Sequence, residues 1–229
     1  MDGDTVFDKN GVKFVINPND EFGLTRAIWF QQKQQAEVTV ITVGDPSCEP
    51  TLRKCLAIGA NKAVRVDLNP TDGFQVAQQL SAHCKVENYD LIIAGRESID
   101  YNGAMVAGMI SALLGYNFVT NCMALEVDGN RVKASREIDE GIESVSCQLP
   151  VVIGAQKGLV EEKDLIIPNM RGIMQARQKS LSVIPPVEGE IRSSISKFEK
   201  PGPKGAVKMV DADQIDQLID LLHNEAKVI

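Results

Sequence analysis

YDLIIAGRESIDYNGAMVAGMI, residues 89–110, combines a short apolar run, a polar loop and a helical pattern built from small residues. The run from Leu91 to Ala94 is typical of a strand in a parallel sheet that is covered on both faces. The apolar pattern that resumes at Met105 predicts a helix that continues to Leu114. The segment therefore predicts half of a βαβ unit, with the polar loop beyond the carboxyl end of the strand.

That loop is the expected ligand site, because open parallel sheets bind ligands beyond the carboxyl ends of their strands. Asn102 is a suitable N-cap, and the small residues behind it would leave the first N–H groups of the helix open to a phosphate. The carboxylate of Asp100 is suited to a ribose hydroxyl. The candidate nucleotide site comprises Ala94, Gly95, Asp100, Asn102, Gly103, Ala104 and Met105.

An ordinary strand-to-helix turn remains the alternative for this loop. Such turns commonly use Asn, Gly and Asp for conformational reasons. Neither the G-x-x-x-x-G-K-[ST] nor the G-x-G-x-x-G phosphate motif occurs in residues 89–110. The residue types alone leave both interpretations open.

Composition narrows the class of protein. The chain has 229 residues, of which 44% are hydrophobic and 24% charged, an ordinary globular balance. A net charge of −7 argues against general nucleic-acid binding, which needs a basic face. There is no run of 18 apolar residues and no signal-like N-terminus, so we expect a cytoplasmic protein without membrane insertion.

The cysteines and histidines do not form a catalytic or metal-binding pattern. The five cysteines are scattered and never spaced as C-x-x-C, which predicts buried thiols and no disulfide framework or metal site. His83 and His223 are the only histidines and lie far apart in the sequence. We therefore expect no hydrolase triad.

Strand and helix patterns alternate along the first half of the chain. Val12 to Ile16 predicts a hairpin or edge strand before a first helix that ends near Gln35. Further strands are predicted at 38–43, 62–68 and 91–94, and helices at 49–58, 76–84 and 105–114. This alternation predicts an α/β fold with a doubly wound, mostly parallel, Rossmann-like sheet. Residues 123–149 predict a small β-hairpin addition with a third strand, and 150–155 a strand of the main sheet.

The second half ends in an apolar loop and an arm. The loop 165–170 runs into a helix that carries Met170, Ile173 and Met174, and it is either a covered core edge or a docking surface. Pro185-Pro186 ends the α/β domain, 1–185. Residues 186–229 predict an extended arm with an amphipathic helix at 211–226, which either embraces a partner subunit or packs on its own domain.

Six stretches in this order resemble the β subunit of electron transfer flavoprotein over about residues 8–229. They are NPNDE (17–21), LRKCLAIGA (52–60), AGRESID (94–100), REIDEGIE (136–143), LPVV (149–152) and IPNMRGIMQAR (167–177). The resemblance implies a non-catalytic partner of an α subunit that holds most of the FAD. It also implies AMP in the β subunit, or a second FAD in electron-bifurcating members. Where the family often has Thr-Gly-Gln, this chain has Gly103-Ala104-Met105, which leaves only main-chain donors for a phosphate. The identity of the nucleotide in this subunit, AMP or FAD, therefore stays open.

The resemblance further implies docking to acyl-CoA dehydrogenases or similar flavin dehydrogenases, whose electrons pass to a downstream acceptor. The family's recognition loop falls within 163–180, with Ile167 at the position of the anchoring leucine. Glu143 matches an acidic residue proposed to touch the mobile FAD domain of the α subunit, although an ordinary surface glutamate is the alternative. The expected docking residues are Leu165, Ile167, Pro168, Met170, Ile173, Met174 and Glu143.

One departure from the family concerns the start of the chain. Family members begin with a strand and a Pro-Asp loop that contribute to the nucleotide pocket, whereas the printed sequence begins at Met1-Asp2-Gly3-Asp4, after that point. We therefore expect an unpaired slot in the sheet unless another segment fills it. A stand-alone adenine-nucleotide-binding regulator of the universal-stress-protein type is the alternative function, but it would need a glycine-rich phosphate loop.

Overall fold

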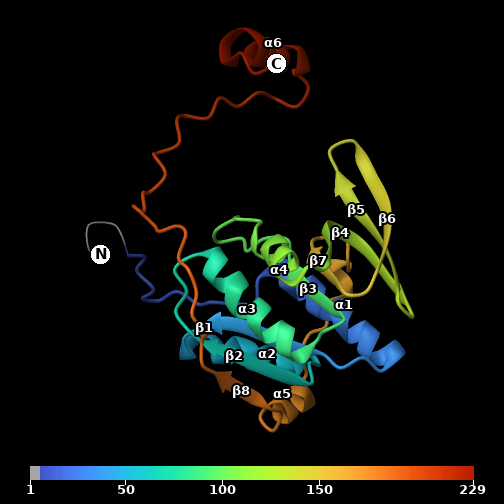
Figure 1. The fold of residues 1–229 in the computed structure, drawn as a ribbon. Coiled ribbons are helices and arrows are strands. Elements are labelled where there is room, and N and C mark those ends of the chain that lie inside the picture. Colours follow the sequence, from blue (N-terminus) through green and yellow to red (C-terminus); the bar gives the residue numbers. More distant parts are fainter. Residues whose placement is uncertain (1–5) are drawn as a thin grey trace. The chain divides into compact units, whose positions relative to one another are not determined.

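The computed structural model describes residues 6–229, so Met1-Asp2-Gly3-Asp4 lies outside the described residues. The chain divides into two compact units. Lys9–Ser194 forms one of them, and the rest of the described residues belong to the other. The candidate nucleotide site and the predicted recognition loop within 163–180, called the docking loop below, both lie in the Lys9–Ser194 unit (Figure 1).

The Lys9–Ser194 unit contains two sheets instead of the single sheet expected from the sequence. The three-stranded sheet has the order β1 (Thr39–Gly44), β2 (Lys62–Asp67) and β8 (Leu181–Ile184), all parallel. The five-stranded sheet has the order β3 (Leu91–Gly95), β7 (Val151–Ala155), β4 (Asn117–Asp128), β5 (Arg131–Ile138) and β6 (Gly141–Gln148). The pairs β3–β7 and β7–β4 are parallel, and β4, β5 and β6 form antiparallel pairs. The α/β class and the hairpin addition are thus confirmed, while β8 was not predicted.

Helices cover both faces of the parallel strands. They are α1 (Pro18–Gln34), α2 (Glu49–Ile58), α3 (Gly73–Glu87), α4 (Val106–Leu114) and α5 (Met170–Ala176), with short 3-10 turns η1 (Pro46–Cys48) and η2 (Glu162–Asp164). On β3, Ile93 packs into the core that contains Phe30 of α1, whereas Ile92 packs with Ala77 of α3 and Ile110 of α4. Helices α1 and α3 therefore lie on opposite faces.

The edges of β1 and β3 carry no partner strand among the described residues. β1 pairs only with β2, and β3 pairs only with β7. All five residues of β3 are half-buried, whereas all five of β7 are buried. The two sheets have no ladder in common among the described residues, so the single doubly wound sheet expected from the sequence is not found.

Helix α1 joins the two sheets by packing. Its Leu24 and Ile28 belong to the core that includes Leu56 of α2 and Val38 before β1, and its Phe30 packs into the core of the five-stranded sheet. Just before α1, the strand predicted at Val12–Ile16 is wrong: these residues form neither helix nor strand. Ile16 alone among them is buried, in the α1–α2 core, so it anchors the entry to the helix.

The first part of the predicted arm packs along α3. The amide of Gln79 both donates to Val187 O (2.8 Å) and accepts from Val187 N (2.7 Å). Asp72, which caps α3, also accepts the main-chain N–H groups of Arg192 (2.7 Å) and Ser193 (2.8 Å). The compact unit therefore extends to Ser194. In the other unit, α6 (Ile215–Asp220) and the π-helical turn η3 (Leu221–Ala226) lie within the helix predicted at 211–226.

The direction of the main-chain groups along β1 and β3 gives a testable prediction. Val38 O accepts from Asn61 N (2.8 Å), so the main-chain groups of Val38 point toward β2. Main-chain groups point to alternate sides along a strand, so the N–H of Thr42 points toward β2 and the N–H of Ile41 toward the free edge. On β3, Asp90 O accepts from Val151 N (3.1 Å), so the N–H of Ile92 points toward β7 and the N–H of Ile93 points away from it. We expect the amides of Ile41 and Ile93 to exchange with deuterium faster than those of Thr42 and Ile92, measured residue by residue.

Thr42 and Ile92 are matched controls because each lies in the same strand as its test residue. Equal protection of the four amides would show that the two edges are hydrogen-bonded to something else.

Candidate functional site

The amino end of α1 meets the carboxyl end of β3 and the loop that follows. We refer to this junction of residues 17–20 with residues 95–105 as the crevice, because it lies beyond the carboxyl end of a parallel strand. Asp20 Oδ1 accepts the main-chain N–H of Gly95 (N···O 2.6 Å), and Oδ2 accepts from Asn17 Nδ2 (2.7 Å). A Cβ on Gly95 would lie only 2.7 Å from Asn17 Nδ2 and 2.9 Å from Asp20 Oδ2. Position 95 therefore needs glycine for the approach of the helix.

Two asparagines tie the helix to the loop. Asn17 Nδ2 and Asn19 Nδ2 both donate to Glu97 O, at 2.8 Å and 3.2 Å, and Ile99 N donates to Asn17 Oδ1 (3.3 Å). Asn17 occupies the N-cap position of α1 but makes no side-chain cap hydrogen bond. The amino end of a 17-residue helix, with the positive end of its dipole, therefore faces the crevice without a side-chain acceptor.

Asp20 is a half-buried carboxylate whose charge is poorly compensated. Burial raises the pKa of Asp20 above its ordinary value, and the hydrogen bonds from Asn17 and Gly95 lower it by less. The main-chain and amide donors thus hold the carboxylate in place without removing the unfavourable free energy of burying its charge. Asn17, Asn19 and Asp20 were not among the site residues predicted from the sequence, although NPNDE was recognised as a helix start.

The role predicted for Asn102 as a helix N-cap is wrong. Helix α4 begins at Val106, its N-cap position is Met105, and no side chain caps it. Asn102 instead adopts a left-handed conformation (φ 49°), as does Ala104 (φ 49°), and Asn102 N donates to Ser98 O (2.7 Å). Asparagine tolerates this conformation better than most residues, so turn chemistry explains its presence.

The other predicted site residues are distributed around this loop. Ala94 packs into the core beneath α3 and α4, so its side chain does not face the crevice. The carboxylate of Asp100 accepts the hydroxyl of Ser98. Met105 closes the loop over the start of α3, with its Sδ 3.3 Å from where a Cβ on Gly73 would lie. The residues exposed along the loop are Ser98, Ile99, Asp100, Tyr101, Asn102, Gly103, Ala104 and Met105.

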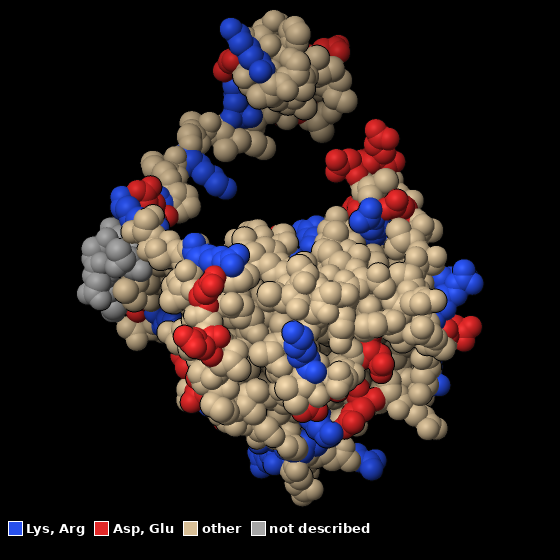
Figure 2. Space-filling model, in the orientation of Figure 1, with Lys and Arg blue, Asp and Glu red and all other residues tan. Residues whose placement is uncertain are grey.

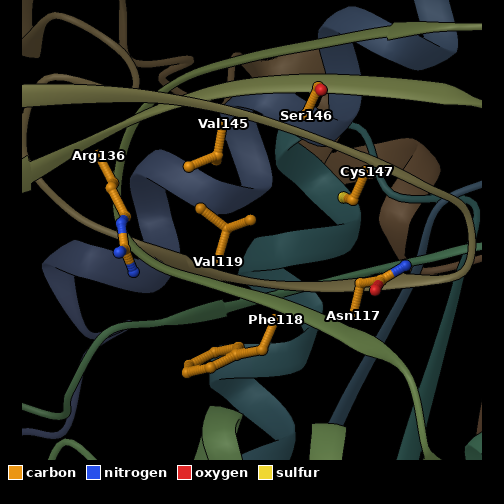
Figure 3. A pocket seen from close by; sticks show the side chains of 7 residues that line it. All are labelled: Asn117, Phe118, Val119, Arg136, Val145, Ser146 and Cys147. Atoms are coloured by element: carbon orange, nitrogen blue, oxygen red, sulfur yellow. The ribbon is translucent and has the colours of Figure 1, made fainter.

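Two cavities lie on the β4–β6 hairpin. One, of about 250 Å³, is lined by Asn117, Phe118, Val119, Arg136, Val145, Ser146 and Cys147 (Figure 3). The other, of about 400 Å³, lies farther along the same strands, between Leu125 and Ser146. In the first, Arg136 Nε pairs with Glu143 Oε2 (2.5 Å). The predicted docking residue Glu143 is therefore partly neutralised by its neighbour across the β5–β6 ladder.

The docking loop turns one isoleucine inward and the next outward. Ile166 packs against the α1–α2 core, and its N–H donates to Thr25 Oγ1 (3.5 Å). Ile167 is 85% exposed, and Met170 and Met174 on α5 are exposed as well. Leu165 and Pro168 are half-buried, and Ile173 lies near the limit of exposure at 40%. The loop thus presents apolar side chains at the surface, which favours the docking interpretation over a covered core edge.

Helix α2 holds the base of this loop firmly. A Cβ on Gly172 would lie 2.5 Å from Ala57 O, so α5 approaches α2 at backbone distance. Arg53 Nη1 donates to Ala176 O and Lys179 O, both at 2.8 Å. Lys179 Nζ donates in turn to Ala60 O (2.7 Å) beyond the end of α2, and burial lowers the pKa of this lysine. The exposed side chains therefore stand on a fixed base.

The chain matches a family model described as "Electron transfer flavoprotein domain" over residues 4–188. It is 32% identical over 234 residues to the electron transfer flavoprotein subunit beta of Bacillus subtilis (strain 168), covering 96% of this chain and 90% of that protein. The chain belongs to the electron transfer flavoprotein family, as a β subunit. The mitochondrial subunit beta of Arabidopsis thaliana is 31% identical over 231 residues (98% and 91% covered), and the Homo sapiens subunit beta 27% over 227 residues (96% and 88%).

Membership of this electron transfer flavoprotein family confirms the resemblance drawn from the six sequence stretches, and with it a role in electron transfer. The stand-alone regulator is thereby displaced as the function of the chain. No helix within residues 6–229 has both the length and the apolar character needed to cross a membrane.

The contact between Asp20 and Gly95 predicts a stability effect in this β subunit. The substitution Asp20→Ala leaves the N–H of Gly95 and the amide of Asn17 without their acceptor, so we expect the free energy of unfolding to fall by about 1–3 kcal/mol. The adjacent Glu21→Ala removes only a partly exposed ion pair with Lys54 (3.1 Å), so it should cost less than about 1 kcal/mol. Urea unfolding of both variants measures the difference, and equal losses would contradict the prediction.

Proposed function

We propose that this β subunit pairs with an electron transfer flavoprotein α subunit that holds FAD, and that the heterodimer carries electrons from primary dehydrogenases, such as acyl-CoA dehydrogenases, to a downstream acceptor. Electron transfer needs close approach of partners and not a nucleophile or an acid–base pair. The cysteines agree with a subunit that has no nucleophile, since burial raises the pKa of Cys55 to about 12 and of Cys84 to about 11 and so keeps both thiols protonated. The proposal rests chiefly on family membership.

The crevice is the proposed adenine-nucleotide site of the subunit. The amino end of α1 has no side-chain cap, and the loop after β3 contributes exposed main-chain groups, so a phosphate can approach both. Both N–H groups of the Asn17 amide are used, by Asp20 Oδ2 and Glu97 O, so Asn17 holds the loop in place. Asn19 keeps one amide donor beyond its bond to Glu97 O, and Asp100 offers an acceptor for a ribose hydroxyl. These donors suit AMP, which when bound is a structural ligand without redox chemistry; a second FAD, which would add a redox centre, is the other outcome.

The surface of the subunit supplies the contacts for electron-transfer partners. Ile167 is an exposed branched side chain next to a proline, so its backbone is restricted and little conformational entropy is lost when it enters a pocket. On the hairpin, acidic side chains gather at the tip (Figure 2), where the chain carries Asp139 and Glu140 close to Glu143. We assign Ile167 to dehydrogenase docking and Glu143 to the FAD-bearing part of the α subunit.

The C-terminal unit is proposed to embrace the α subunit. Helix α6 leaves Ile215, Leu218 and Ile219 exposed, with exposed fractions of 63%, 43% and 51%. These apolar side chains recur at helical spacing, which is typical of a face that packs against a partner.

A cytoplasmic location remains a prediction, since the relative from Arabidopsis thaliana is described as mitochondrial.

The nucleotide content of the co-expressed heterodimer tests the proposed site. Denaturation should release one AMP per complex in addition to the FAD of the α subunit, both measured by chromatography. Asn17→Ala removes amide contacts of the crevice and should lower AMP occupancy. The control Asn117→Ala removes a comparable bond to Gln148 O (2.8 Å) on the hairpin and should leave occupancy unchanged.

Release of two FAD molecules and no AMP would assign the site to a second flavin. Release of a single FAD and no other nucleotide would remove the proposed site.

Docking is tested by Ile167→Ala. Hot-spot side chains contribute at least about 2 kcal/mol, so the second-order rate of flavin reduction by an acyl-CoA dehydrogenase should fall by roughly tenfold or more, with an unchanged flavin spectrum. Val86→Ala is the control, because Val86 is also a strongly exposed aliphatic residue (76%) but lies at the end of α3. Rates that are equal for the two variants would refute the docking role.

A further inference from the structure

A chain of polar contacts leaves the crevice toward the hairpin. Arg96 directly follows β3, and its Nη1 donates to Gln156 Oε1 (3.2 Å). The other terminal nitrogen, Nη2, pairs with the carboxylate of Glu97. Glu97 is also the residue whose carbonyl accepts the amides of Asn17 and Asn19 at the amino end of α1. The guanidinium of Arg96 therefore connects the crevice to Gln156.

Gln156 continues this chain to the hairpin. Its side chain follows the last residue of β7, is 5% exposed, and donates through Nε2 to Glu137 Oε2 (2.7 Å) on β5. Glu137 lies opposite Ile142 in the β5–β6 ladder, next to the pair formed by Arg136 and Glu143. The ladder that carries the proposed α-subunit contact is thus joined to the residue beside the crevice.

The orientation of the Gln156 amide is set by its two neighbours. Its oxygen faces a cation and its nitrogen faces a carboxylate, and the reversed amide would place like partners together. A buried amide with both ends occupied is held in one position, because either lost bond leaves a buried polar group unpaired. Arg96 and Glu137 are therefore linked through a single, nearly inaccessible side chain.

We propose that Gln156 is a positioning residue that couples nucleotide binding in the crevice to the position of the β5–β6 hairpin. The inference rests on the proposed nucleotide site. A nucleotide that orders residues 95–100 holds Arg96 in place, and through Gln156 it holds Glu137 and the adjoining Arg136–Glu143 pair. By linkage, a partner that docks on the hairpin tightens nucleotide binding by the same factor.

Reversal of donor and acceptor in this chain provides the test, carried out on the co-expressed heterodimer. Gln156→Glu places two carboxylates against each other, whereas the double variant Gln156→Glu with Glu137→Gln restores an acceptor for Arg96 and a donor between positions 137 and 156. The control Gln34→Glu makes the same chemical change at a glutamine of α1 that bonds Val127 O (2.9 Å) on β4 outside the chain of contacts. AMP affinity and deuterium exchange of residues 137–143 are the two readouts.

We expect Gln156→Glu to weaken AMP binding by roughly 3- to 30-fold and to speed the deuterium exchange of residues 137–143. The double variant should bring both readouts back to within about twofold of the wild-type values. Gln34→Glu should change neither readout. Equal AMP affinity and equal exchange in the Gln156→Glu and wild-type complexes would overturn the coupling alone. Failure of the double variant to recover either readout would also overturn it, since simple local damage then explains the loss. A wild-type complex that binds no AMP would overturn the proposed nucleotide site itself.

Discussion

The packing of α1 against two separate sheets is the interaction on which the rest of the structure depends. Because β1 and β3 have no ladder in common among the described residues, no main-chain hydrogen bonds join the three-stranded sheet to the five-stranded one. Leu24 and Ile28 of α1 pack into one core and Phe30 into another, so apolar burial replaces a ladder as the connection. The same helix places its amino end at the crevice. Sheet arrangement and site geometry are therefore set by one element.

Asp20 illustrates how position and stability are separated at this site. Its two hydrogen bonds fix the distance between α1 and Gly95, yet burial still raises the pKa of the carboxyl group. As an anion, the side chain therefore makes an unfavourable electrostatic contribution to folding, which is smallest below its ordinary pKa and grows as the pH rises through the raised one. The charge itself therefore does not stabilise the fold; the side chain stabilises it by giving the N–H of Gly95 and the amide of Asn17 an acceptor.

The two regions proposed to contact partners are built in different ways. The docking loop is held by Arg53 and Lys179 on carbonyl groups of the α2 and α5 segments, so Ile167 is presented from a fixed base. The arm is fixed along α3 only as far as Ser193, by Gln79 and Asp72, and the exposed apolar residues of α6 belong to a separate compact unit. A fixed loop suits brief encounters with several partners, while an arm suits a lasting association with one.

The sequence by itself determined the alternation of strands and helices, the hairpin and, through six short stretches, the family, whereas the outward side chains of the docking loop came from the structure. These features are local, because periodicity and turn residues report on neighbours along the chain. Only the tertiary structure decided that Asn17 and Asp20, about eighty positions from Gly95, form the crevice, that Asn102 serves a turn and not a cap, and that Leu181–Ile184 pairs with β2. The physical reason is that such contacts depend on where α1 packs between the sheets, and that position follows from buried area contributed by segments far apart in the sequence.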